Sequence, residues 1–191
     1  MKKQLKLPRP HIYEILFVFL VSGVIGWVYE TIVESIHAGG FTARGIIMFL
    51  EINGVTIIWG FPFILVYALG GIMLVTIFRS LVNHPWRLFF IGMAAMTFFE
   101  LLTSYFCEYI LHQTLWVYPP SWITFEGRIS VVASLFWGIA SVMAVRIISP
   151  LFHKLYKKIK TKKSLHAILI TLTVYVLICY ILKRLIFPGK I

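Results

Sequence analysis

The sequence predicts an all-α protein, a polytopic integral membrane helix bundle of about five transmembrane helices. Of the 191 residues, 60% are hydrophobic and only 13% are charged, whereas roughly a quarter of the residues in a soluble domain are charged. Apolar stretches of about 20 residues recur along the chain, and at about 1.5 Å per residue each can cross a hydrocarbon core about 30 Å thick. The expected environment is therefore the lipid bilayer of the cell membrane.

Five stretches have the length and composition of spans. A basic N-terminal segment, 1–11, precedes a single transmembrane domain, 12–187, and a short tail, 188–191. The expected spans are about 12–36, 55–78, 88–111, 129–152 and 165–187. The first is too long for a signal-peptide core and has no cleavage site after it, which predicts that it is retained. Cys107 and Cys179 fall inside spans without metal-ligand or disulfide spacing, so both are expected to be packing residues.

The distribution of Lys and Arg predicts a cytoplasmic N-terminus. The chain has 18 Lys and Arg against seven acidic residues, all of them Glu, and a formal charge of +11. With the N-terminus inside, most of the basic residues are cytoplasmic, as the positive-inside rule requires. The exceptions are Arg44, Arg128, Lys183, Arg184 and Lys190, which lie outside, and Arg146, which can snorkel inward. Lys183 and Arg184 argue against a full crossing by the last helix. The positive charge fits anionic lipid and does not indicate nucleic acid.

The end of the first expected span carries three ionisable residues on one helical face. Glu30, Glu34 and His37 lie with Gly23 and Gly26 within about 80° of one another, at about 100° per residue. Small residues allow another helix to approach closely, so this acidic face is expected to point into the bundle. Glu30 is expected about 7 Å beyond the midplane, Glu34 near the boundary and His37 among the head groups.

Glu100, near the middle of the third expected span, is the most costly residue to place in a membrane. A charged side chain there costs about 2.5 to 3.5 kcal/mol on insertion scales, so Glu100 should be protonated, paired with a cation or in contact with water. The candidate cations are Arg44 and Arg128 on the outer side. The apolar stretch Ile46–Leu50 is too short to span and could lie in the interface or re-enter, carrying Arg44 toward Glu30. The sequence leaves the pairing open.

Six short motifs follow one another through roughly residues 12–155. They are GWVYE at 26–30, ARG at 43–45, ELLTS at 100–104, WVY at 116–118, EGRIS at 126–130 and SLFWG at 134–138. In order and spacing they resemble the CmpB-like ABC transporter permease family. The resemblance implies a membrane component involved in transport. It marks Trp27, Tyr29, Glu30, Arg44, Gly45, Glu100, Trp116, Tyr118, Gly127, Arg128, Trp137 and Gly138.

The outer segments depart from the family pattern. Ala43, Val117 and Glu126 replace an Asn, an Asp and an Asn, respectively. The longer stretch FLEINGVTIIWGFP, 49–62, replaces a Gly-Pro and Pro-x-Tyr-Gly segment that the family carries after Gly45. A ligand shared with the family would therefore meet a different outer loop in this chain.

These observations predict a small-solute transporter subunit with an intramembrane polar cluster near the outer face. The cluster is expected to contain Glu30, Arg44, Glu100 and Arg128, with Tyr29, Trp116 and Tyr118. No Walker A pattern is present, so ATP-driven transport would need a separate ATPase subunit. The inside loop Leu151 to His166 has the bulk to bind one. No motif predicts a cofactor, and a homo-oligomer is compatible with the sequence.

Two other functions fit parts of the sequence. A metal-handling protein would use Glu30, Glu34 and His37 with Glu108 and His112, but carboxylate-bridged bundles need two Glu-x-x-His motifs and this chain has one. A non-enzymatic interaction or regulatory factor of the membrane would have the same sequence features. No catalytic motif is found, because no serine has an adjacent base within a recognisable pattern, so no enzyme activity is predicted.

Overall fold

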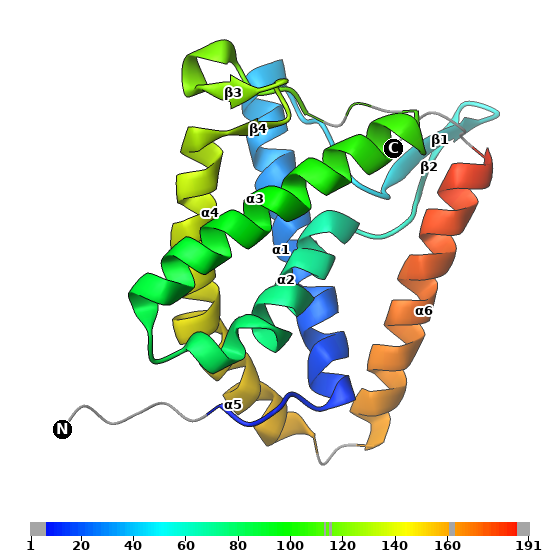
Figure 1. Cartoon of the computed structure of the whole chain (residues 1–191). Coiled ribbons are helices and arrows are strands. Elements are labelled where there is room, and N and C mark those ends of the chain that lie inside the picture. Colours follow the sequence, from blue (N-terminus) through cyan, green and yellow to red (C-terminus); the bar gives the residue numbers. More distant parts are fainter. Residues whose placement is uncertain (1–6, 113, 115, 161–162, 187–191) are drawn as a thin grey trace. The chain divides into compact units, whose positions relative to one another are not determined.

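The computed structural model describes residues 7–112, 114, 116–160 and 163–186, without the side chains of His37, 48–52, Arg184 and Ile186. The described chain is mostly helical, with loops and two short β-hairpins between the helices (Figure 1). It divides into two compact units, which are described separately. Unit 1 comprises the residues up to His11 together with Ile72–Leu155, and unit 2 comprises Ile12–Gly71 and the chain from Tyr156 onward. The predicted all-α class is confirmed.

Four helices are long and apolar enough to cross a membrane. They are Ile12–Ile36, Pro85–Tyr109, Val131–Ile159 and Lys163–Lys183. This finding confirms a polytopic membrane protein. The helix Val131–Ile159 joins α4 (Val131–Met143) to α5 (Ser149–Ile159) through a π-helical segment, η3 (Ala144–Ile148).

The prediction of a helix over 55–78 is wrong for the first part of this range. Val55–Trp59 forms strand β2, and the helix that follows, α2 (Leu65–Thr76), has 12 residues. At about 1.5 Å per residue it is about 18 Å long, too short to cross a core of about 30 Å. The cause is the turn Asn53-Gly54, whose positive φ angles of 52° and 77° fit a type I′ hairpin turn.

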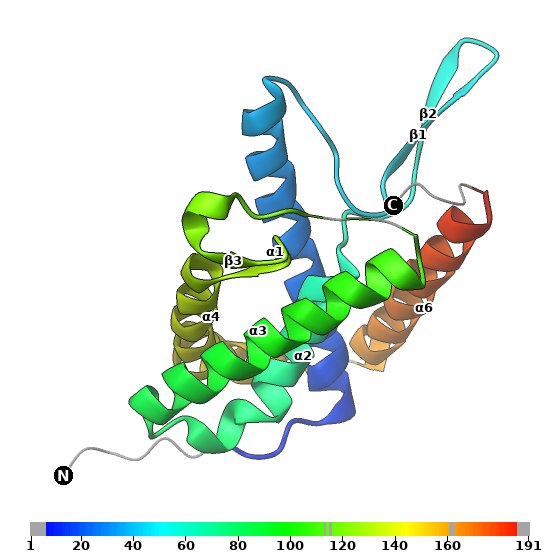
Figure 2. The same cartoon turned by 45° about the horizontal axis from the view of Figure 1, so that its top comes forward.

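Unit 2 is built around α1 (Ile12–Ala38) and α6 (Lys163–Ile186), which pack against each other. Between them in the chain, β1 (Met48–Ile52) pairs with β2 in an antiparallel hairpin that projects beyond the adjoining loops (Figure 2). Residues 48–50, expected to lie in the interface or re-enter, therefore form strand β1. Glycines allow close packing on α1, because a Cβ at Gly23 would overlap the ring of Phe63.

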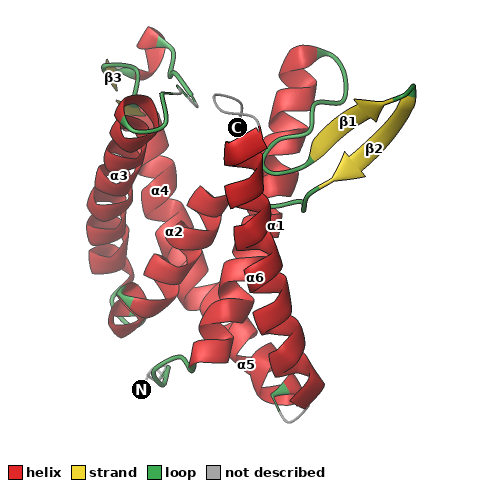
Figure 3. Cartoon of the chain, turned by 90° about the vertical axis from the view of Figure 1, so that its right-hand side faces the viewer, coloured by secondary structure: helices red, strands yellow, loops and turns green. Residues whose placement is uncertain are grey.

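Unit 1 is built around α3 (Pro85–Tyr109) and α4, which lie side by side (Figure 3). Small residues permit the contact, since Gly92 lies against Ser141 and Thr97 donates a 2.8 Å hydrogen bond to Ser134. A short 3-10 helix, η1 (Phe78–Leu81), precedes α3. The core beside these helices consists of Leu74, Phe78, Val82, Leu88, Met96 and Val145.

The expected inside loop Leu151 to His166 is mostly helical. Helix α5 continues to Ile159 and α6 begins at Lys163, while residues 161–162 lie outside the described chain. Phe152 and Tyr156 are buried one turn apart, and Lys154 and Lys158 are exposed. This amphipathic spacing explains why a basic segment forms a helix instead of a loop.

Candidate functional site

Glu100 is buried in unit 1 and receives two hydrogen bonds from neutral aromatic side chains. Its side chain is 5% exposed. The hydroxyl of Tyr118 donates to Oε1 at 2.5 Å, and Nε1 of Trp137 donates to Oε2 at 3.1 Å. Among the residues that the structure describes, no cation contacts this carboxyl group. Of the three expected environments for Glu100, pairing with a cation is therefore not the one found. We call Glu100, Tyr118 and Trp137 the Glu100 network.

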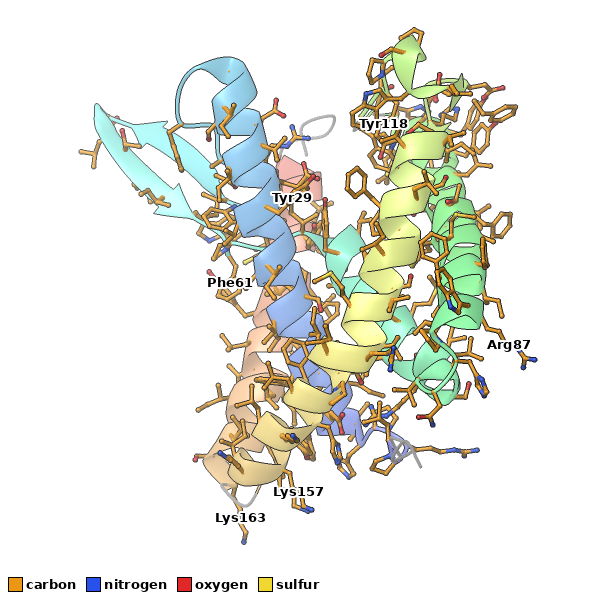
Figure 4. The ribbon with its side chains drawn as sticks, turned by 90° about the vertical axis from the view of Figure 1, so that its left-hand side faces the viewer. Tyr29, Phe61, Arg87, Tyr118, Lys157 and Lys163 are labelled. Carbon is orange, nitrogen blue, oxygen red and sulfur yellow. The ribbon has the colours of Figure 1, made fainter. Side chains whose placement is uncertain are left out.

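Three separate parts of unit 1 form the Glu100 network. Glu100 lies on α3, Trp137 on α4, and Tyr118 in the segment between these helices. The backbone N–H of Tyr118 donates to the carbonyl of Gly127 at 2.8 Å, and its ring stacks on Trp122 with centroids 5.7 Å apart. Tyr118 lies at one end of the α3–α4 pair, and Arg87 lies at the other (Figure 4). The network is thus fixed by a folded segment at one end of the pair.

That segment contains a second small hairpin, which positions Arg128. Strands β3 (Thr124–Phe125) and β4 (Ile129–Ser130) are joined through Glu126 and Gly127, whose φ angles are 52° and 66°. The carbonyl of Arg128 accepts a 3.0 Å hydrogen bond from Nε1 of Trp116. Because the backbone is left-handed at both of these positions, a glycine is favoured at position 127. This requirement gives a local reason for the Gly of the EGRIS motif.

The guanidinium group of Arg128 binds three side chains. Nε donates to Glu126 at 3.0 Å, Nη1 donates to Ser104 at 3.1 Å, and Nη2 forms an ion pair with Glu108. The group also lies over the ring of Tyr105, with Cζ 4.3 Å from the centroid. Arg128 therefore lies in the same unit as Glu100, but its described acidic partners are Glu108 and Glu126.

These contacts shift the pKa values of the exposed Glu126 and the half-buried Arg128. The hydrogen bond from Tyr105, followed by that from Arg128, holds the pKa of Glu126 below its usual value. Burial lowers the pKa of Arg128, but its bonds to Glu108 and Glu126 outweigh this effect, so the pKa is raised. Both groups are thus charged at neutral pH, and the carboxylates compensate the arginine.

Glu30 and Arg44 are held in unit 2 by different partners. Oε1 of Glu30 accepts a 2.6 Å hydrogen bond from the hydroxyl of Tyr67, whose ring lies 6.2 Å from that of the exposed Tyr29. The carbonyl of Arg44 accepts a 2.9 Å hydrogen bond from Nε1 of Trp27. Within the described part of the chain, the partner of the Glu30 carboxyl is Tyr67 and not Arg44.

The five residues considered for a metal do not form a ligand group among the residues that the structure describes, and Glu30 is bound to Tyr67. Glu108 is paired with Arg128, and His112 is exposed just after α3 with a positive φ of 54°. Glu34 is on α1, and the side chain of His37 lies outside the described residues. Over the chain that the structure describes, no three His, Cys or Glu side chains are grouped to hold a metal ion.

Sequence reasoning missed several partners in these contacts. Trp137 was marked only by the family resemblance, and Glu126 only as a departure from it. Ser104 and Glu108 lie at i+4 and i+8 from Glu100, so helical spacing offered a signal for one shared face. Tyr67 carried no signal, because it approaches Glu30 from 37 residues away along the chain.

Four apolar helices with ionisable groups held within and beside them define a multi-pass membrane protein. A family model described as "Putative ABC-transporter type IV" matches residues 17–182, most of the chain. The chain belongs to this family. The match extends into α6, beyond the stretch that carries the recognisable motifs. Comparisons with curated proteins and with solved structures found no match.

Proposed function

We propose that this chain is the membrane subunit of an ABC-type transporter, and that it handles a small solute at the Glu100 network without catalysing a covalent reaction. The observation that carries the proposal is a carboxyl group buried within a membrane-spanning helix and bound by two neutral donors. Such a group is costly in hydrocarbon and is stabilised by gaining a proton or a cationic group. An intramembrane ionisable residue of this kind is a functional site by default.

The surroundings of Glu100 suit a solute with a polar or cationic group. Tyr118 and Trp122 present stacked rings beside the carboxyl group, and aromatic faces attract cations. The neighbouring Arg128 cluster is already compensated by Glu108 and Glu126. Among the described residues, the carboxyl group of Glu100 has no compensating cation, and a solute would be recognised by that group.

ATP hydrolysis would come from a separate subunit. The sequence has no Walker A pattern. Helix α5 presents exposed Lys154, Lys157 and Lys158, and the basic surface continues to Lys160. Within unit 2, Lys157 and Lys163 lie at the end opposite Tyr29 (Figure 4). We propose this basic surface, rather than a flexible loop, as the place where an ATPase docks.

Co-purification tests the proposal directly. The protein, tagged at its native level, is extracted in mild detergent, and stoichiometric partners are identified by mass spectrometry. We expect an ATPase that is retained by a Glu100→Gln variant and lost when Lys154, Lys157, Lys158 and Lys160 are changed to Gln. An Arg87→Gln variant, altered at an exposed residue of α3, is the control and should retain the partner. Absence of any ATPase would contradict the transporter function and favour a regulatory factor.

The role of Glu100 needs a second readout. In vesicles that contain the purified complex, candidate solutes are tested for stimulation of ATP hydrolysis. We expect Glu100→Gln to keep the basal hydrolysis rate and to lose the stimulation, because the variant keeps the shape and loses the charge. Equal stimulation of both proteins would remove Glu100 from the solute site.

A further inference from the structure

The β1–β2 hairpin presents exposed apolar side chains on both of its faces. On β2, the side chains of Val55 and Ile58 are 61% and 68% exposed, and that of Ile57 is exposed as well. Successive residues of a strand point to opposite faces, so Ile57 and Ile58 place an apolar group on each face. In water, the hairpin would leave this apolar surface uncovered, which is unfavourable.

The base of the hairpin is bonded to α6 within the candidate span Lys163–Lys183. The chain enters the hairpin after Gly45 and leaves it at Gly60. The carbonyl of Gly60 accepts a 3.3 Å hydrogen bond from the hydroxyl of Tyr175, and the carbonyl of Gly45 accepts one from Nζ of Lys183. Tyr175 precedes the end of the span by eight residues, about 12 Å at about 1.5 Å per residue. The base therefore belongs to the part of unit 2 that lies within the bilayer.

The hairpin projects sideways from unit 2 at the level of the end of α6 (Figures 1 and 3). The end of a spanning helix lies where the hydrocarbon core meets the lipid head groups. An element that extends sideways at this level runs along the boundary of the bilayer and does not extend away from it.

The polar residues of the hairpin lie toward its tip. Near the base, the register pairs Ile58 with Phe49, and both residue types are apolar. Toward the tip, Thr56 pairs with Glu51, and the turn Asn53-Gly54 follows. Glu51 is the only charged residue in the sequences of the two strands. This distribution fits a base in contact with hydrocarbon and a tip among hydrated head groups.

The edges of the hairpin limit how deep it can lie. In a hairpin with a two-residue turn, the residue pair beside the turn exchanges hydrogen bonds, so the N–H and C=O groups of Thr56 and Ile58 point away from β1. In the described part of the chain, no other backbone group pairs with them. Unpaired backbone groups are not tolerated in the hydrocarbon interior, because no water reaches them there. The hairpin therefore fits the boundary of the bilayer and not its centre.

We propose that the β1–β2 hairpin is an interfacial anchor, an element that lies in lipid at the boundary between hydrocarbon and head groups. Its partner is the lipid: acyl chains cover Val55, Ile57 and Ile58, and the tip lies nearer to water than the base does. The contact is apolar and does not require anionic lipid, because the strands carry no basic residue. This inference concerns a surface of unit 2 and depends neither on the solute role of Glu100 nor on an ATPase.

The test measures the surroundings of single spin labels on the full-length protein in phosphatidylcholine nanodiscs. Labels are attached in Ile58→Cys, near the base, and in Gly54→Cys, at the tip, where a Cβ meets no heavy atom within 4 Å. Val174→Cys, at an exposed apolar residue of α6, is the reference for lipid, and Lys157→Cys, at an exposed lysine of α5, is the reference for water. Collision rates with oxygen, which concentrates in lipid, and with a water-soluble nickel chelate are recorded for each label.

The native cysteines interfere little, because Cys107 and Cys179 are buried, and the parent protein taken through the same labelling gives the background. We expect the label in Ile58→Cys to collide with oxygen several-fold more often, and with the nickel chelate several-fold less often, than the label in Lys157→Cys. The label in Gly54→Cys should lie between the Ile58→Cys and Lys157→Cys values. Replacing part of the lipid by phosphatidylglycerol should leave these rates unchanged.

Three results would each overturn the proposal. Nickel access in Ile58→Cys equal to that in Lys157→Cys would place the hairpin in water. Low access to both reagents would mean that protein covers the hairpin, from a second copy or another partner. Oxygen access that appears only with phosphatidylglycerol would make the contact electrostatic. Val55→Cys, at a second exposed position of β2, repeats the measurement, so the result does not depend on one variant.

Discussion

The hydroxyl of Tyr118 lies 2.5 Å from Oε1 of Glu100 and ties the segment between α3 and α4 to the interior of a membrane helix. Together with the indole of Trp137, it gives a buried carboxyl group two donors without giving it a compensating charge. An arrangement built only for stability would more simply use a neutral side chain or an ion pair. The contact therefore links the fold of unit 1 to the ionisation state of Glu100.

Glu100 variants should separate the hydrogen bonds from the charge. Glu100→Gln can accept from Trp137 and donate to Tyr118, so we expect a melting temperature equal to or above that of the parent. Glu100→Ala removes the acceptor of the Tyr118 hydroxyl and of the Trp137 indole N–H and should cost about 2 to 4 kcal/mol. Thermal unfolding in detergent measures both, with Glu34→Ala as a control. A large loss in Glu100→Gln would mean that the ionised group is needed for folding.

The close contact between α3 and α4 should be sensitive to side-chain size at Gly92. A Cβ at this position would overlap the side chain of Ser141. Gly92→Leu is therefore expected to destabilise the protein by about 1 to 3 kcal/mol through overpacking. Gly40→Leu is the matched control, because no heavy atom lies within 4 Å of a Cβ there. Equal melting temperatures for the two variants would show that the helices do not approach as described.

The Glu126 carboxylate should make stability depend on pH in one direction. Its pKa is lowered in the folded protein by Tyr105 and Arg128, relative to about 4.3 for an unfolded chain. Its contribution is then fully present above the unfolded value and is lost as the pH falls through the lower, folded value. The melting temperature of the parent should exceed that of Glu126→Gln at pH 7, and the difference should shrink as the pH falls below about 4.3. A difference that stays constant with pH would contradict the assignment.

Arg128 should not be replaceable by lysine. The guanidinium group reaches Glu126, Ser104 and Glu108 through three different nitrogens, and a single ammonium group cannot reproduce this fork. We expect the segment around Arg128 to loosen in Arg128→Lys. Trypsin cleaves after both residues, so its cleavage rate after position 128 can be compared directly and should rise several-fold. Arg87→Lys, at an exposed position of α3, should leave cleavage after position 87 unchanged.

The class of the fold was predictable because the bilayer sets the length of an apolar helix. The same rule failed over 55–78, since hydropathy does not distinguish an apolar strand from the start of an apolar helix. A local signal was available there: Asn53-Gly54 between apolar residues is a strong indication of a hairpin. The turn chemistry of Asn53-Gly54 outweighed the hydropathy of the residues around it.

The sequence predicted residues of the candidate site, but it did not predict which of them contact one another. The cost of an ionisable group in hydrocarbon identified Glu100 without any structure. Its partners Tyr118 and Trp137 come from 18 and 37 residues further along the chain, and residue type alone carries no information on such distances. Lys183 shows the same limit. Its charge predicted a position on the outer side, whereas its side chain is buried and its Nζ donates to the carbonyl of Gly45.

The β1–β2 hairpin gives this protein a convenient point for labelling. Its tip, Asn53-Gly54, is exposed, and a Cβ at Gly54 would meet no heavy atom within 4 Å. Insertions at such tips are tolerated well, because few contacts depend on them. A short epitope placed between Asn53 and Gly54 would be bound by an antibody on intact cells only if the hairpin faces outward. The hairpin that replaced an expected crossing thus becomes a reporter of the topology of the whole chain.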